Sequence, residues 1–251
     1  MSATTSKTVD VKTAEGVADS YLARPDDGRA HPGVLLMVDA FGLRPQIEAM
    51  ADRIAGAGYV VLAPNVFYRA GRAPVVDLDG LDDPERRGEV IARVMPLARE
   101  LRTERIIADG AAYLARLADE ADGGPVAISG YCMGGRFGWQ IAAAFPDQVD
   151  ALACFHTGGL VTDDEDSPHL SAAELDAELY LGFADGDKSA TPDQIATVEA
   201  ALRAAGKEFE ATVFEGAEHG YTMADTPAYD EGAAERHYEE LSRLLSRTVG
   251  G

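Results

Sequence analysis

The chain has 251 residues, 46% hydrophobic and 7% aromatic, which suits one soluble globular domain over residues 1–251. Its formal net charge of −21 argues against nucleic acid or an anionic membrane as a partner, because both need basic patches. No apolar run approaches the roughly 20 residues that span a bilayer, and the N-terminus does not resemble a secretory signal. We therefore expect a cytoplasmic protein that is a monomer or a small homo-oligomer.

The predicted elements alternate between strand and helix after an N-terminal pair of strands. Thr8–Thr13 and Gly16–Arg24 predict a short antiparallel edge. Further strands are predicted at Gly33–Val38, Tyr59–Ala63, Val126–Ser129, Asp150–Phe155, Glu178–Phe183 and Phe209–Phe214. Helices are predicted at Pro45–Ala57, in two parts of Asp83–Glu120 divided near Thr103, at Gly135–Ala142, after Thr191, and at Tyr229–Ser246. The acidic segment Thr162–Ala173 is expected to be a surface loop. This alternation predicts an α/β fold with a doubly wound, mostly parallel sheet flanked by helices.

The strand at Val126–Ser129 runs into Gly130-Tyr131-Cys132-Met133-Gly134 and then into a helix. A reactive side chain between glycines at a strand-to-helix turn is typical of the nucleophile elbow of the α/β-hydrolase fold. Here cysteine occupies the position where serine is usual. A buried structural cysteine is the alternative for Cys132, and it is the expected role of Cys154, which lies within a predicted strand.

A thiol nucleophile needs a base, and the base needs an orienting acid. In this fold both follow the nucleophile along the chain, acid first. Asp185 stands directly after a strand and is preferred to Asp187 as the acid. His219 lies beside a glycine in the loop before the last helix and is the candidate base, with His156 as its rival.

These motifs together resemble the dienelactone hydrolase family, over about Gly33 to Leu245. The motifs are Gly-Tyr-Cys-Met-Gly-Gly, the turn at Asp185 and Glu-His-Gly-Tyr. The resemblance implies a triad of Cys132, His219 and Asp185 that hydrolyses an ester or lactone through an acyl-enzyme. It also implies an oxyanion hole formed by the backbone N–H groups of Ala40 and Met133.

The chain departs from the family pattern where substrate is bound. The family has a glutamate that contacts the resting thiol, and Asp39 stands in its place. Met223 occupies the position of an arginine that holds a substrate carboxylate, which methionine cannot bind. Arg69, Arg72 and Arg87 are possible substitutes. We expect Asp39, Arg69, Tyr131 and Met223 around the substrate.

The sequence thus predicts a hydrolase of a small ester or lactone, with no metal and no organic cofactor, since no residue cluster has the spacing of metal ligands. Two alternatives remain open. The chain could be a thioesterase, a peptidase or a dehalogenase-like enzyme on the same fold. It could also be a non-catalytic, redox-sensing or binding protein that retained a reactive thiol.

Overall fold

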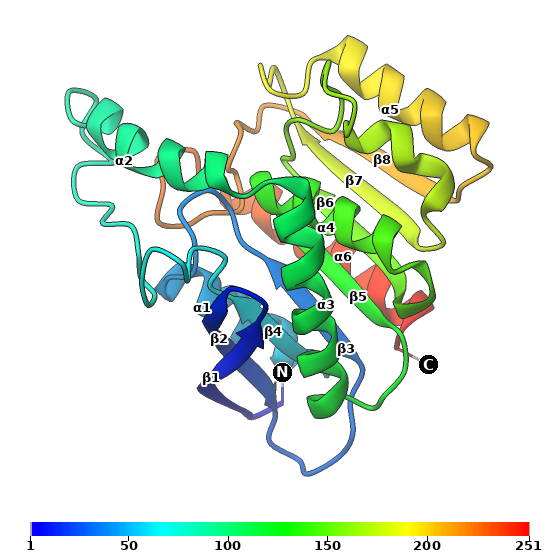
Figure 1. Ribbon diagram of the computed structural model, residues 1–251. Helices are drawn as coiled ribbons and strands as arrows, with labels where there is room; N and C mark the ends of the chain where they lie inside the picture. The colour runs from blue at the N-terminus through cyan, green and yellow to red at the C-terminus, as the bar shows by residue number, and fades with distance from the viewer. Residues whose placement is uncertain (1, 251) are drawn as a thin grey trace.

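The computed structural model describes residues 2–250 and contains one mixed sheet of eight strands between two layers of helices (Figure 1). The strand order is β1-β2-β4-β3-β5-β6-β7-β8. The strands are β1 (Thr4–Thr13), β2 (Gly16–Pro25), β3 (Gly33–Met37), β4 (Val60–Pro64), β5 (Val126–Tyr131), β6 (Val149–Phe155), β7 (Glu178–Ala184) and β8 (Phe209–Phe214). From β4 to β8 in the sheet all neighbours are parallel, whereas β1 and β2 are antiparallel to their neighbours. The predicted fold class is confirmed. Residues 1 and 251 of the expected domain lie outside the described residues.

The N-terminal hairpin is antiparallel, as predicted, but longer than predicted. Strands β1 and β2 have ten residues each and pair from Thr4↔Pro25 to Thr13↔Gly16. The first five residues of β1 are exposed. They therefore lack the alternation of apolar and polar side chains that signals a half-buried strand.

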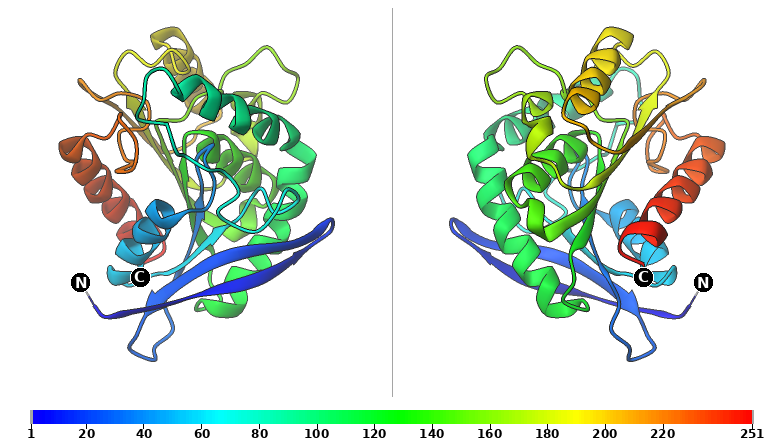
Figure 2. Two further views of the ribbon diagram at one scale, coloured as in Figure 1. Left: turned by 90° about the vertical axis from the view of Figure 1, so that its left-hand side faces the viewer. Right: turned by 90° about the vertical axis from the view of Figure 1, so that its right-hand side faces the viewer.

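Helices cover both faces of the central parallel strands, so β3, β4 and β5 are built from apolar runs. Helices α1 (Pro45–Gly56) and α6 (Glu231–Thr248) pack on one face, and α3 (Thr103–Glu120) and α4 (Met133–Ala144) on the other (Figure 2). Helix α5 (Pro192–Ala204) lies on the α4 side, and α2 (Arg87–Glu100) connects to α3 through a short turn. Every residue of β3, β4 and β5 is buried.

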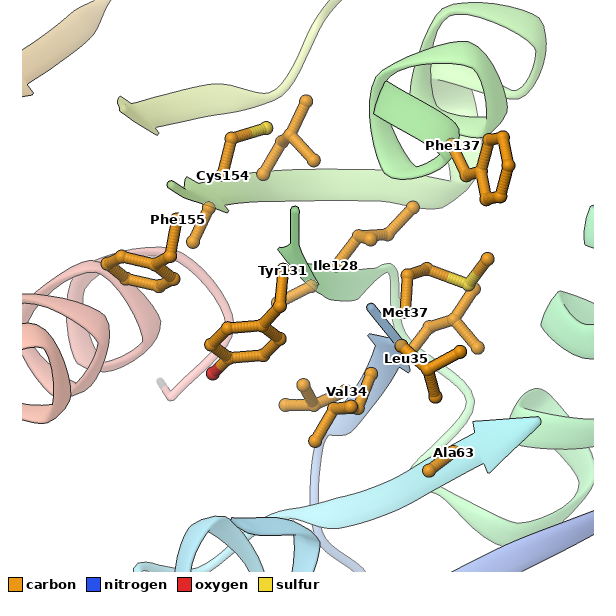
Figure 3. Packing of buried hydrophobic residues seen from close by; sticks show 14 of the residues in the cluster. Val34, Leu35, Met37, Ala63, Ile128, Tyr131, Phe137, Cys154 and Phe155 are labelled. Atoms are coloured by element: carbon orange, nitrogen blue, oxygen red, sulfur yellow. The ribbon is translucent and has the colours of Figure 1, made fainter. Parts of the chain in front are cut away.

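The centre of the sheet separates two apolar layers. Figure 3 shows Tyr131 and Phe155 on the side that faces α6, and Phe137 of α4 on the opposite side. The rings of Tyr131 and Phe155 stack with centroids 5.6 Å apart. Tyr131 and Phe155 are also paired in register between β5 and β6. The loops after β3, β5, β6, β7 and β8 meet at the carboxyl ends of the strands, where ligands bind in open α/β sheets.

Three local expectations differ from the structure. The helix predicted from Asp83 begins at Arg87, and the last helix begins at Glu231, because the Asp230 side chain accepts a hydrogen bond from the backbone of Ala233 (2.8 Å). The acidic segment is a loop only in part. It contains a 3-10 helix, η2 (Pro168–Glu174), whose Pro168 and Ala172 are buried. Within residues 2–250, no helix is both long and apolar enough to cross a membrane.

Candidate active site

The turn between β5 and α4 holds Cys132 in a strained conformation. Its φ of 52° and ψ of −118° are unusual for a residue with a side chain. The glycines around it are required by space. A Cβ atom on Gly130 would lie 2.4 Å from the carbonyl oxygen of Gly134, and one on Gly134 would lie 2.2 Å from that of Met37. The sequence thus forces β5, α4 and the end of β3 together and leaves the cysteine side chain half-buried.

Three side chains form a continuous line at this turn. The Sγ atom of Cys132 lies 3.0 Å from Nε2 of His219. The other ring nitrogen of His219, Nδ1, lies 2.6 Å from Oδ2 of Asp187. A thiol, an imidazole and a carboxylate thus lie within hydrogen-bonding reach of one another, as a nucleophile, its base and an orienting acid would.

The acid in this line is Asp187, so the prediction of Asp185 is wrong. The carboxylate of Asp185 instead accepts a hydrogen bond from the backbone N–H of Gly216 (3.1 Å), in the turn that follows β8. Gly186 has a φ of 64°, and the turn that it makes brings Asp187 back toward His219. Ser189 fixes Asp187 further, because its hydroxyl and its backbone N–H donate to Oδ1 at 2.7 and 2.8 Å.

The charges of this line favour an imidazolium. Burial lowers the pKa of His219, but the hydrogen bonds to Asp187 and Cys132 outweigh it and raise the pKa to about 10. Burial likewise raises the pKa of Asp187, but hydrogen bonds from His219 and Ser189 outweigh it and lower the pKa to about 2. The protonated form of His219 is therefore stable next to Cys132 at neutral pH.

Two backbone N–H groups lie beside the thiol. Met133 provides the first N–H of α4, and Ala40 follows β3; both residues line a cavity together with Cys132. In the described part of the chain, neither N–H donates a hydrogen bond to another protein group. Donors that are free and already in place suit a developing oxyanion.

Cys132 lies where two cavities meet. The wide cavity, about 610 Å³, is lined by both apolar residues such as Leu101 and Phe137 and polar residues such as Thr103 and Arg136. The narrow cavity, about 350 Å³, is lined mainly by apolar side chains, including Leu81, Val94 and Met223. Ala40, Met95, Cys132 and His219 line both. A molecule bound at Cys132 can therefore extend into either cavity.

The sequence profile of the dienelactone hydrolase family matches residues 18–249. The chain belongs to this family. A Methylorubrum extorquens protein assigned as a carboxymethylenebutenolidase is 29% identical over 240 residues, 93% of this chain and 78% of that one. The carboxymethylenebutenolidase of Rhodococcus opacus is 27% identical over 218 residues, 86% of this chain and 81% of that one. The solved structure of a Klebsiella pneumoniae protein assigned as a dienelactone hydrolase superposes with a TM-score of 0.82 at 24% identity, covering 98% of this chain and 99% of that one. The chain is thus a hydrolase with the α/β-hydrolase fold.

Asp39, at the position of the dienelactone hydrolase family's glutamate, does not contact the thiol. Its carboxylate is buried and accepts two hydrogen bonds from Arg44, at 2.6 and 3.0 Å. Arg44 also binds the carboxylate of Asp225 (2.6 and 3.0 Å). Burial lowers the pKa of Arg44, but the two carboxylates outweigh it and raise the pKa. The Asp39 carboxylate is held by this ion pair, although Asp39 lines the narrow cavity together with Cys132. That Asp39 helps to activate the thiol stays a prediction.

Two other residues expected around the substrate lie elsewhere. Arg69 binds Asp109 (2.9 and 3.1 Å) and Glu15 and lines neither cavity. Tyr131 is fully buried against α6, with its hydroxyl 3.1 Å from Nε2 of His237. Strand alternation could have shown this, because neighbouring side chains point to opposite faces of a sheet. Met223 does line the narrow cavity, as expected for a substrate contact.

The remaining candidate arginines and the rival base are also placed. Arg72 is exposed and pairs with Asp10, whereas Arg87 lines the narrow cavity and donates from Nε to the carbonyl oxygen of Leu81 (3.0 Å). His156 is fully buried, and its Nε2 lies 2.8 Å from the hydroxyl of Thr222. Burial and the charge of His219 lower the pKa of His156 well below its usual value. His156 therefore packs beside His219 as a neutral ring, with centroids 5.4 Å apart, and does not reach Cys132.

Sequence reasoning missed Ser189, and it did not single out Arg136, which lines the wide cavity. Ser189 orients Asp187 and lies 3.2 Å from Nδ1 of His219, and the Asp-x-Ser spacing of residues 187–189 was the only signal for it. In residues 2–250, no three His, Cys, Asp or Glu side chains gather as a group that could hold a metal ion.

Proposed function

We propose that the chain hydrolyses a small ester or lactone through an acyl-enzyme on Cys132. The observation that carries this proposal is the line from Cys132 through His219 to Asp187, located where two cavities meet beside two free backbone N–H groups. Membership of a family with named carboxymethylenebutenolidases supports the same reaction class.

In the first half-reaction, the Cys132 thiolate attacks the carbonyl carbon, and the carbonyl oxygen takes up the negative charge. The N–H groups of Met133 and Ala40 donate hydrogen bonds to this oxygen. When the bond to the leaving oxygen breaks, the His219 imidazolium gives its proton to the alcohol or, in a lactone, to the hydroxyl of the opened ring.

In the second half-reaction, water replaces the thiolate. Neutral His219 takes a proton from the water that attacks the thioester carbon, and the carboxylic acid leaves as the thiolate re-forms. Asp187 keeps the ring oriented and stabilises its positive charge throughout. The balance is one ester bond and one water consumed, with one alcohol and one acid formed.

The narrow cavity favours substrates with a small apolar part. Its volume of about 350 Å³ lies near the lower end of the range for small-molecule sites, roughly 300–1,000 Å³. We therefore expect short acyl or alkyl groups to be preferred to long ones.

The test is hydrolysis of a panel of 4-nitrophenyl esters, lactones and thioesters, with mass spectrometry of acid-quenched enzyme. We expect an acyl group on Cys132 and a loss of roughly 10⁴- to 10⁶-fold in kcat for Cys132→Ala. The Cys154→Ala variant serves as the control, since Cys154 lies in β6. Activity retained by Cys132→Ala, or an acyl group on another residue, would overturn the proposal. A preference for thioesters by orders of magnitude would replace the ester reading with a thioesterase.

A further inference from the structure

His156 follows β6 directly and is held in a conformation that lowers the stability of the fold. Its φ is 39°, and among residues 2–250 Cys132 is the only other residue besides glycine with a positive φ. Its side chain is fully buried, and Nδ1 has no hydrogen-bond partner in the described part of the chain. Backbone strain of this kind is concentrated at active sites, and an unpartnered buried polar atom calls for an explanation. A role at the neighbouring site would explain both features.

The ring of His156 contacts three residues of one loop, which leads from β8 to α6 and carries His219. It lies edge-to-face against the rings of His219 and Tyr221, with centroids 5.4 and 5.1 Å apart. Both contacts have the geometry that aromatic pairs prefer. Its Nε2 lies 2.8 Å from Oγ1 of the buried Thr222, within hydrogen-bonding distance. The base and two of the three residues after it therefore pack against a single ring.

The backbone beside this ring is bonded to the centre of the sheet and to the nucleophile. The N–H of His156 donates to the carbonyl oxygen of Gly182 in β7 (2.7 Å). The carbonyl oxygen of Phe155, one residue earlier, accepts a hydrogen bond from the backbone N–H of Cys132 (3.0 Å). The end of β6 thus binds the nucleophile through Phe155 and the loop of the base through His156.

A second buried histidine, His237 of α6, provides a comparison. It is also fully buried, and its Nε2 lies 3.1 Å from the hydroxyl of Tyr131. Its Nδ1 lies 2.6 Å from the carbonyl oxygen of Ala234, so both ring nitrogens have partners. Of the two described cavities at Cys132, the narrow one is lined by His156 and neither is lined by His237. Of these two histidines, only the one beside the base combines a strained backbone with an unpartnered nitrogen.

We propose that His156 is a positioning residue for the base: through Thr222 and its ring contacts, it holds the loop of His219 where Nε2 reaches Sγ of Cys132. This inference rests on the proposed hydrolase function, in which His219 transfers the proton. An uncharged ring suits the role, because a second imidazolium would repel that of His219. Burial and the charge of His219 lower the pKa of His156 well below its usual value. Since displacing a catalytic arrangement by about 1 Å can cost about 100-fold in rate, a small shift of the loop should be visible in kcat.

The first test breaks the bond between His156 and Thr222 from each side. Thr222→Val removes the hydroxyl, and His156→Phe keeps a ring but removes Nε2. We expect each variant to lower kcat for a 4-nitrophenyl ester about tenfold, with KM within about threefold. Thr222→Ser, which keeps the hydroxyl, should stay within about threefold of the wild type. Because both substitutions break one bond, the double variant should lose about as much as either single variant.

His237→Phe is the matched control, since it changes an equally buried histidine that lines neither described cavity. It should lower the midpoint of urea unfolding and leave kcat per folded molecule within about threefold. The inference is overturned if Thr222→Val keeps the kcat of Thr222→Ser, if His237→Phe loses as much kcat as His156→Phe, or if the double variant shows the product of the two single losses. Should His156→Phe not fold, the comparison of Thr222→Val with Thr222→Ser decides alone.

The second test needs no turnover. Iodoacetamide alkylates the thiolate of Cys132, which His219 stabilises only when it is in place. At neutral pH we expect Thr222→Val and His156→Phe to slow this alkylation, and Thr222→Ser and His237→Phe to leave it unchanged. Equal rates in all four variants overturn the inference, even if esters are hydrolysed. If the wild type hydrolyses no ester but alkylation follows the expected pattern, the proposed function fails, and the positioning of His219 by His156 stands.

Discussion

The carboxylate of Asp187 lies 2.6 Å from Nδ1 of His219. Asp185, two residues earlier, accepts a hydrogen bond from the backbone N–H of Gly216 instead. The two acids therefore serve as matched variants. We expect Asp187→Asn to lower kcat on the order of 10²- to 10⁴-fold, since His219 loses its orienting charge. We expect Asp185→Asn to stay within a fewfold of the wild type. The reverse order in ester hydrolysis would restore Asp185 as the acid.

The same pair sets the alkaline limit of activity. Asp187 raises the pKa of His219, so the imidazolium persists until the pH passes about 10. The proton donor is present below that value and is lost above it. Profiles of kcat/KM against pH should therefore fall through about pH 10 in the wild type. In Asp187→Asn the fall should begin at lower pH, and an unmoved limb would show that Asp187 does not control His219.

The two thiols should differ in reactivity. Cys132 lies beside His219 in an open cavity, whereas Cys154 is buried, and burial raises the pKa of its thiol. We expect iodoacetamide to label Cys132 alone in the folded protein, and His219→Asn to slow that labelling roughly tenfold or more at neutral pH. Peptide mass spectrometry measures both. Equal labelling of Cys154 would contradict the burial described.

Gly135 is required by packing and not by backbone conformation. A Cβ atom there would lie 1.9 Å from Oγ1 of the buried Thr157. Gly135→Ala should therefore lower the free energy of unfolding by about 1–3 kcal/mol or more. The control is Gly124→Ala, where the nearest atom would be Asp122 Oδ1 at 3.4 Å. Urea unfolding monitored by circular dichroism compares the two, and equal midpoints would contradict the clash.

Stability should depend strongly on Arg44, because its ion pair with Asp39 is buried. Removal of Arg44 leaves the buried Asp39 carboxylate without a charged partner, which typically costs about 3–5 kcal/mol. Arg44→Gln should thus lower the unfolding midpoint clearly. Arg86→Gln, which breaks the exposed pair with Asp79, should change it little. Similar midpoints for both variants would indicate that water already screens the Asp39 pair.

The features that the sequence predicted well are local. Burial of β3 to β7 is visible in the sequence as apolar runs, and the close approach of backbone around Cys132 is visible as glycines. The choice between Asp185 and Asp187 depends on one turn at Gly186, where two residues of the same type compete. The contact of Arg44 with Asp225 could not be predicted from the sequence, because the two residues are 181 positions apart in the chain. Long-range ion pairs leave no periodic signal in a single sequence.

Because of the position of β8, we expect the candidate active site to be lost at a lower denaturant concentration than the fold. β8 is the last strand of the sheet, and only Phe214 of its six side chains is buried. His219 follows this strand, whereas Cys132 follows β5 in the middle of the sheet. Edge segments open at lower free energy than the core. As denaturant rises, the base will therefore separate from the thiol before the central strands unfold, and catalysis will cease while most helical structure persists.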